Sequence, residues 1–182
     1  IDRVVNEGAH VLSLMPPFPS ADWSSEAPDG LPTTGYPGVR LRQAWAPKDP
    51  QDLADFIGRA VAHYKDRVRV WEFLNEPVFT NYALPADRAN QYEGKNYSPA
   101  DYVALLDVAS RAMKKADPSC RVIGGIAGGP ELLTREVIDA GCLKHVDLFN
   151  LHGYPGQRRP EGFIDMDALL ARMDKAGGRK PI

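Results

Sequence analysis

The sequence has 182 residues, of which 43% are hydrophobic and 25% are charged, values typical of one globular unit or part of a larger one. Lys and Arg number 22 and Asp and Glu number 24, which gives a formal charge of −2 without any basic block. This balance excludes the electrostatic footprint of a nucleic-acid-binding or anionic-membrane-binding protein. We therefore expect a small or neutral partner.

The cysteines give no sign of a disulfide framework or a metal site. Cys120 and Cys142 are too few for such a framework and lie outside any CxxC or Cys/His ligand spacing, so we expect two buried thiols. No cofactor is expected, because no His, Cys and Asp cluster has ligand spacing. No apolar run approaches the roughly 18 residues of a membrane span, and residues 1 to 15 lack a signal-peptide pattern. A processed start would look the same, so the compartment stays open.

The first predicted elements are a strand and a helix. Residues 10 to 15, "HVLSLM", predict a buried strand, and a stretch rich in Pro, Ser and Gly follows to about residue 48. Asp49 then offers an N-cap and Pro50 a first-turn residue. Apolar residues recur behind them at helical spacing and predict a buried helix face made of Leu53, Phe56, Ile57, Ala60, Val61 and Tyr64.

The second predicted strand spans about residues 68 to 74, and a helix begins at the sequence "SPADY". Ser98 with Asp101 resembles a capping box, and Pro99 suits the first turn. The apolar stripe of this helix is predicted to contain Tyr102, Leu105, Leu106, Ala109 and Met113.

The remaining elements repeat the same alternation. We predict a strand at "CRVIGGIAG" from Cys120, a helix over about 130 to 140, and a strand at "VDLFNLHGY" from Val146. A helix over about 166 to 175 should end at Gly177 and Gly178, and residues 179 to 182 should enter another strand.

Strands that alternate with helices predict βα units on a parallel sheet, whose strands are apolar on both faces. We count four full units, preceded by a helix tail at "IDRVVNEG" and followed by the start of a fifth strand. A closed eight-stranded barrel typically needs about 250 residues. The sequence therefore predicts either a small open sheet or a central slice of a barrel, and its start and stop inside units favour the slice. Residues 1–182 would then be a fragment of a single domain.

The strand "VWEFLNEP", residues 70 to 77, ends in polar groups. The carboxyl ends of parallel strands form the functional face in α/β proteins, and Asn75 and Glu76 sit at such an end. Both can face one site only if the extended geometry breaks there, and Pro77 fits a strand that stops. Glu76 is therefore a candidate general acid. Glu72 lies about 13 Å lower along the strand and is expected to be a buried residue that forms an ion pair or a hydrogen bond rather than the acid.

The fourth predicted strand also ends in polar groups, at the same carboxyl edge of the sheet. Counting by two places Leu148, Asn150, His152 and Tyr154 on one face, polar toward the carboxyl end, and Asp147, Phe149 and Leu151 on the other. His152 and Tyr154 are thus expected to enter the same mouth as Glu76. Taken alone, a His-x-Tyr pair is more often structural, and Glu76 could instead cap the following loop or pair with an Arg.

The motifs "WEFLNEP", "VIGG" about 50 residues later, and "VDLFNLHGYPG" together resemble the retaining glycoside hydrolases of clan A. The nearest likeness is to the β-xylosidase and α-L-iduronidase type family, which are (β/α)8 barrels. The resemblance spans nearly the whole chain, from about the third barrel strand to the start of the seventh. It implies that Glu76 is the acid/base, that Asn75 binds the 2-hydroxyl of the sugar, and that His152 and Tyr154 shape the subsite and orient the nucleophile.

The second carboxylate of a retaining mechanism is missing from this sequence. The resemblance places it as a Glu on the seventh strand, beyond Ile182, and no other acid here is expected at a strand top. The parent protein is expected to be a glycosidase, and this segment alone is not expected to turn over substrate. A carbohydrate-binding pseudoenzyme without the nucleophile is the alternative.

Aromatic side chains in the long loops suggest sugar stacking. Phe18 and Trp23, near the top of the first strand, are the main candidates, whereas Trp45 and Tyr97 are expected to pack near helix starts. The other loop aromatics are Tyr36, Phe79, Tyr82 and Tyr92. The run "GGIAGG" fails the GxGxxG spacing, so a nucleotide-using open sheet is a remote option, and close backbone packing is the better interpretation.

Overall fold

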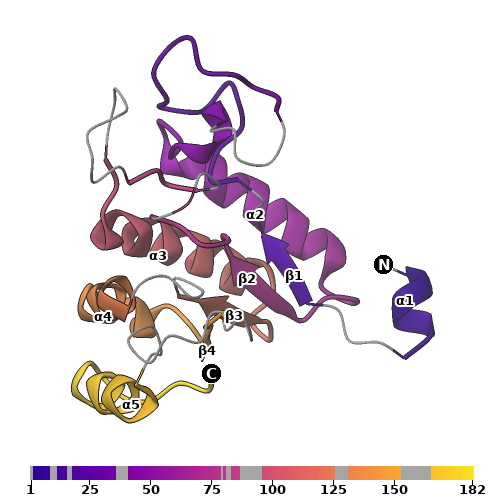
Figure 1. Cartoon of the computed structure of the whole chain (residues 1–182). Coiled ribbons are helices and arrows are strands. Elements are labelled where there is room, and N and C mark those ends of the chain that lie inside the picture. Colours follow the sequence, from indigo (N-terminus) through magenta and orange to yellow (C-terminus); the bar gives the residue numbers. More distant parts are fainter. Residues whose placement is uncertain are drawn as a thin grey trace.

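The computed structural model of the protein describes residues 2–8, 12–15, 18–35, 41–78, 80, 83–86, 96–125, 131–152 and 165–182. Strands alternate with helices along these residues (Figure 1). In chain order the elements are α1 (Asp2–Asn6), β1 (Leu12–Met15), the 3-10 helix η1 (Arg42–Ala44), α2 (Pro50–Tyr64), β2 (Val70–Phe73), α3 (Pro99–Ala116), β3 (Arg121–Gly124), α4 (Glu131–Asp139), the 3-10 helix η2 (Cys142–Lys144), β4 (Leu148–Phe149) and α5 (Met166–Lys175).

The four strands form one parallel sheet in the order β1-β2-β3-β4. On β2, Glu72 is level with Leu14 of β1 and with Ile123 of β3. On the other side of β4, the Phe149 N–H donates to the Pro181 carbonyl at 2.8 Å, where the sequence predicted the approach to a further strand. The predicted parallel α/β architecture is confirmed, while the numbering of these strands within a barrel stays a prediction.

The two faces of β2 differ in burial. Trp71 and Phe73 are fully buried, whereas Val70 and Glu72 are half-buried. The Phe73 ring stacks on Tyr102 of α3 with centroids 6.0 Å apart, so this face lies under the helices (Figure 1). Because strand side chains alternate, Glu72 points to the opposite face of the sheet.

The helix starts follow the predicted caps. The Asp49 side chain accepts from the Gln51 N–H at 2.9 Å, and Ser98 and Asp101 form a reciprocal capping box. The predicted helix over about 166 to 175 is found as α5, capped by Asp165. These local polar contacts explain why the boundaries of the helices were predictable from sequence.

Three expectations need correction. The strand predicted over residues 68 to 74 is shorter, because β2 begins at Val70 and ends at Phe73. The strand predicted from Val146 is only two residues long in β4, Leu148–Phe149, although backbone hydrogen bonds to β3 continue from the Asp147 N–H to the Asn150 N–H. Phe56, predicted on the buried face of α2, is 52% exposed, because the buried face is centred on Leu53, Ile57 and Val61, with Ala60 and Tyr64 partly buried against the core.

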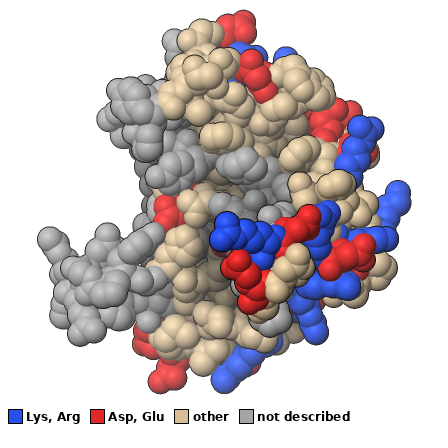
Figure 2. Space-filling view, turned by 90° about the vertical axis from the view of Figure 1, so that its right-hand side faces the viewer, with Lys and Arg blue, Asp and Glu red and all other residues tan. Residues whose placement is uncertain are grey.

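Cys120 and Cys142 are both free and buried, as predicted. Within the described ranges, no helix is both long and apolar enough to cross a bilayer. Figure 2 shows Lys, Arg, Asp and Glu interspersed over one face of the molecule, which agrees with the balanced charge of the sequence.

Candidate active site

The end of β2 leaves extended geometry abruptly. Leu74, Glu76 and Val78 have positive φ values of 59°, 47° and 63°, a left-handed conformation that side chains with a Cβ rarely adopt. Pro77 sits within this run and cannot continue a ladder. The Thr80 hydroxyl donates to the Glu76 carbonyl at 2.7 Å and holds the turn that follows. The predicted break is confirmed, and strained backbone of this kind clusters at functional sites.

Tyr102 of α3 holds two strand ends from the helix side of the sheet. Its hydroxyl accepts from the Gly125 N–H at 3.0 Å and approaches the Phe73 carbonyl at 3.5 Å. Burial raises the pKa of Tyr102 above its ordinary value, so the phenol stays neutral and keeps its proton. The hydroxyl thereby joins the last residue of β2 to the residue after β3.

Glu76 and His152 meet at this end of the sheet. The His152 Nδ1 lies 3.1 Å from the Glu76 Oε1, within hydrogen-bonding distance, across 76 residues of sequence. Both side chains keep access to solvent, with 17% of Glu76 and 29% of His152 exposed. A carboxyl group that is held by an imidazole and still reaches solvent can give and accept a proton at a bound molecule.

A second polar contact lies one level lower. The Asn150 Nδ2 donates to the Glu72 Oε1, so the predicted hydrogen-bonding role of Glu72 is confirmed, although Glu72 is half-buried rather than buried. The two contacts, Glu72 with Asn150 and Glu76 with His152, join β2 to the end of β4 across β3.

Gly124 and Gly125 fit the predicted close packing at the end of β3. A Cβ at Gly124 would lie 2.9 Å from Val146 Cγ1 and 3.1 Å from the Tyr102 hydroxyl. A Cβ at Gly125 would lie 2.4 Å from the Asn150 Oδ1. The rest of the "GGIAGG" run lies outside the described residues.

Asn75 is half-buried beside Glu76, and Tyr154 lies outside the described residues, as do Tyr36, Phe79, Tyr82 and Tyr92. Trp45 and Tyr97 are 2% and 4% exposed, which confirms the expectation that they pack. The Tyr97 hydroxyl accepts from the Ala46 N–H at 2.8 Å and donates to Glu26 Oε1 at 2.5 Å.

Phe18 and Trp23 share a hollow of about 260 Å³ with Phe56 of α2. Trp23 is 74% exposed and Phe18 is half-buried, so both rings are open to a bound molecule. Neither Glu76 nor His152 lines this hollow. The structure therefore places the two predicted aromatic residues together, in a hollow whose lining does not include the acid and the histidine.

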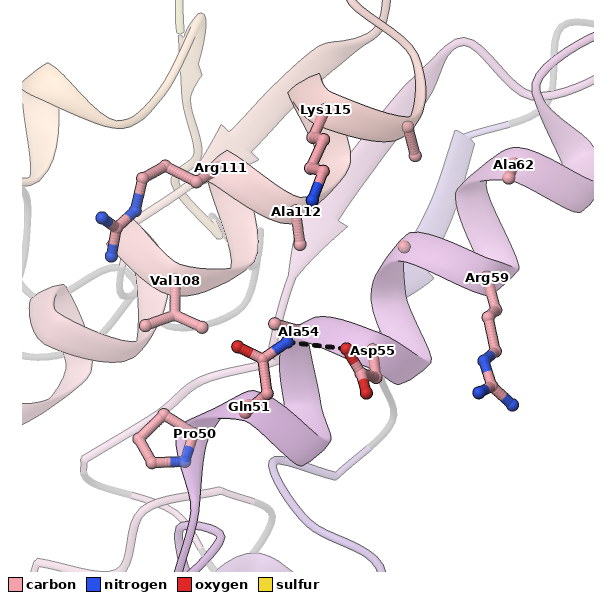
Figure 3. A pocket seen from close by; sticks show the side chains of 12 residues that line it. Pro50, Gln51, Ala54, Asp55, Arg59, Ala62, Val108, Arg111, Ala112 and Lys115 are labelled. Carbon is pink, nitrogen blue, oxygen red and sulfur yellow. Dashed lines mark hydrogen bonds between the residues drawn. The ribbon is translucent and has the colours of Figure 1, made fainter.

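A larger hollow of about 660 Å³ lies between α2 and α3 (Figure 3). It is lined by small side chains such as Ala54 and Ala112 and by the long side chains of Arg111 and Lys115 of α3. Its lining includes none of the polar strand ends, so it does not belong to the candidate site.

Other carboxylates are engaged elsewhere. Asp147, at the amino end of β4, accepts from Lys114 Nζ at 2.6 Å and from the Val122 N–H at 2.9 Å. Among the described residues, no group of three or more His, Cys, Asp and Glu side chains could hold a metal ion.

Sequence reasoning missed two parts of this site. The first is the hydrogen bond from Asn150 to Glu72, which joins residues 78 positions apart in the sequence. The only signal for it was that Asn150 and His152 share a face of their strand. The hydrogen bonds of Tyr102 to the strand ends were not predicted, because Tyr102 falls in the apolar stripe of α3 and was expected only to pack in the core.

No family model matches the chain. A glucosidase from Croceicoccus marinus is 20% identical, with 97% of this chain and 33% of that chain covered, at a TM-score of 0.58. The structure of BuGH86 in complex with neoagarooctaose is 17% identical, with 82% and 25% covered, at a TM-score of 0.51. The chain thus shares its fold with part of these proteins and spans a third or less of their length.

Two further similarities leave the family open. A GH39 β-xylosidase from Caulobacter crescentus is 25% identical over 73% of this chain and 28% of that chain, but the TM-score of 0.49 is too low to assign a family. A peroxynitrite isomerase from Mycobacterium sp. (strain KMS) is 41% identical over 66 residues, which cover 34% of this chain and 29% of that protein. A match of this extent does not describe the chain as a whole.

Proposed function

We propose that the protein containing this chain is a retaining glycoside hydrolase in which Glu76 is the general acid and base. The observation that carries the proposal is the contact of His152 Nδ1 with Glu76 Oε1, 3.1 Å apart at the carboxyl end of the sheet. The glucosidase fold of the Croceicoccus marinus neighbour supports it at the level of architecture. On this proposal the chain is the central part of one (β/α)8 catalytic domain, about strands 3 to 6 and the start of strand 7.

In the first step, the Glu76 carboxyl would give its proton to the oxygen of the departing group, while a second carboxylate attacks the sugar carbon. In the second step, Glu76 would take a proton from water, which then breaks the glycosyl ester. His152 would fix the direction of the Glu76 carboxyl in both steps. No metal or cofactor takes part in this scheme.

The attacking carboxylate would be a Glu beyond residue 182, about 5 to 5.5 Å from Glu76. Two observations support that placement. The Phe149 N–H donates to the Pro181 carbonyl, so Pro181 lies beside β4 on the side away from β3. The polar ends of β2 and β4 already meet, so a further strand next to β4 would bring its own end toward the same place.

The proposed substrate is a β-glycoside or polysaccharide. Asn75 would bind the 2-hydroxyl of the sugar, and Tyr154 would orient the attacking Glu. Phe18 and Trp23 would stack on sugar rings, which present apolar faces to aromatic side chains. Neither nucleic acid nor a membrane is a proposed partner.

The test is the dependence of hydrolysis on the leaving group in the full-length protein. Glu76→Gln removes the proton donor but keeps the shape of the side chain. It should lower kcat/KM by about 10²–10⁴-fold for alkyl glycosides and far less for activated aryl glycosides, which need little protonation. Asp147→Asn is the matched control, because it removes a carboxylate bonded at the opposite end of the sheet.

Asp147→Asn should change the rates for both leaving groups by the same factor. Equal losses on both substrates in Glu76→Gln would contradict the assigned role of Glu76. Sugar binding without hydrolysis in the unaltered full-length protein would support the alternative, a carbohydrate-binding protein that lacks turnover.

A further inference from the structure

We infer that Glu72, Asn150 and Gly125 form a positioning unit that holds His152 against Glu76. The inference rests on the proposed function only where hydrolysis is the readout. Glu72 and Asn150 do not touch the proposed reacting atoms, so they are positioning residues rather than catalytic ones.

Asn150 and His152 are two residues apart and face the same side, toward β2. β4 is only two residues long, and among the described residues its last backbone hydrogen bond to β3 is donated by the Asn150 N–H to the Gly124 carbonyl at 3.2 Å. The Asn150 side chain adds a tie to Glu72 just before His152. This tie therefore sets how far the chain that carries His152 lies from β2.

The spacing along β2 explains how both contacts form together. Four residues of extended strand, from Glu72 to Glu76, would span about 13 Å, while the two from Asn150 to His152 would span only about 7 Å even if fully extended. The positive φ values of Leu74 and Glu76 end the extension of β2 and bring Glu76 back toward the level of His152. The contact of Asn150 with Glu72 fixes the position of β4 relative to β2, and His152 reaches Glu76 because that position is fixed.

The orientation of the Asn150 amide is fixed by charge. Its Nδ2 donates to the Glu72 carboxylate, and the reverse orientation would place the Oδ1 against a negative group. The Oδ1 is buried and has no hydrogen-bond partner in the described part of the chain. A buried carbonyl oxygen without a partner is costly, so the contact with Glu72 is what holds the amide in place.

Gly125 provides the space for this arrangement. Its φ of 152° favours glycine, and a Cβ there would lie 2.4 Å from the Asn150 Oδ1 and 2.9 Å from the Asn150 carbonyl oxygen. Its backbone cannot move away easily, because the Gly125 N–H donates to the buried Tyr102 hydroxyl at 3.0 Å. Any side chain at position 125 should therefore displace Asn150 and, with it, His152.

The first test is a double-mutant cycle in the full-length protein. His152→Ala and Asn150→Ala should each lower kcat/KM for an alkyl glycoside by about 10-fold or more and change its pH profile in the same way. The double variant should be no worse than His152→Ala alone. Losses that multiply would overturn the inference.

Three further variants, compared with Asn150→Ala, separate positioning from bulk stability. Gly125→Ala should reproduce the pH profile of Asn150→Ala although Asn150 is intact. Glu72→Ala should do the same, and Glu72→Gln, which keeps an oxygen to accept from Asn150, should recover most of the rate. A purely structural role would lower the free energy of unfolding in all four variants without altering the pH profile.

The second test does not require hydrolysis. The nitrogen NMR shifts of the His152 imidazole report its contact with Glu76, and they should move in Asn150→Ala as they move in Glu76→Gln. If they move and no glycoside is cleaved by the full-length protein, the positioning unit stands and the proposed function fails. Unchanged His152 shifts in Asn150→Ala would overturn the inference itself.

Discussion

Removing the Tyr102 hydroxyl should weaken the fold and disturb the candidate site together. Tyr102→Phe keeps the ring that stacks on Phe73 and deletes only the oxygen that accepts from the Gly125 N–H at 3.0 Å. Gly125 is buried, so its N–H would lose its partner without gaining water. Leaving a buried donor unsatisfied costs about 1–3 kcal/mol.

The contact of the hydroxyl with the Phe73 carbonyl adds little, because 3.5 Å is at the limit of a hydrogen bond. We expect Tyr102→Phe to lower the free energy of unfolding by about 2 kcal/mol in urea denaturation of the full-length protein. The loosened Gly125 should also shift the NMR signals of His152.

Tyr97→Phe is the matched control. Tyr97 is also a buried tyrosine whose hydroxyl accepts a backbone N–H, that of Ala46 at 2.8 Å, but it holds the loop before α2 instead of a strand end. Tyr97→Phe should lower stability by at least as much, because the Tyr97 hydroxyl also donates to Glu26, and it should leave the His152 signals in place. The reasoning would be refuted if Tyr102→Phe were as stable as the unaltered protein, or if both variants moved His152 equally.

Three other predictions concern single groups. Burial raises the pKa of Asp147, but the hydrogen bonds from Lys114 and Val122 outweigh it and hold that pKa below its usual value. The contribution of Asp147 to the free energy of unfolding should therefore be present above about pH 4 and be lost as the pH falls through the folded pKa. Asp147→Asn should lower the free energy of unfolding by about 2 kcal/mol at pH 7 and make it depend less on pH in acid. Burial raises the pKa of the Cys142 thiol to about 12, so iodoacetamide at pH 8 should label it only after unfolding, and rapid labelling of the native protein would contradict its burial. Trp23 is exposed while Trp45 and Trp71 are buried, so acrylamide should quench mainly the fluorescence of Trp23. An oligosaccharide that stacks on Trp23 should reduce this quenching. Quenching of the same extent in Trp23→Phe would refute the assignment.

Local signals made much of the fold predictable. Asp49, Ser98 and Asp165 are side chains that satisfy the free N–H groups of their own helices, so their effect is readable within a few residues. The apolar runs predicted a parallel sheet, because strands that are covered on both faces are continuously hydrophobic and do not alternate polar with apolar residues. The end of β2 was predictable because Pro77 cannot continue a ladder.

The candidate site was predictable only as a set of strand ends. That Glu76 and His152 lie at the same edge of the sheet follows from the parallel strands. Their 3.1 Å contact, however, depends on the left-handed backbone of Leu74 and Glu76, which neither residue type predicts. The exposure of Phe56 was missed because an apolar residue at helical spacing can lie at the edge of the buried face. The Asn150 contact with Glu72 was missed because tertiary pairing decides it.

The role of Glu76 can be measured most directly by adding azide to the full-length Glu76→Ala protein during cleavage of an activated aryl glycoside. This small anion needs no general base and can enter the space that the carboxyl leaves. The account predicts faster turnover and a glycosyl azide whose anomeric configuration matches the substrate in proton NMR spectra. No acceleration, or a product of inverted configuration, would contradict it.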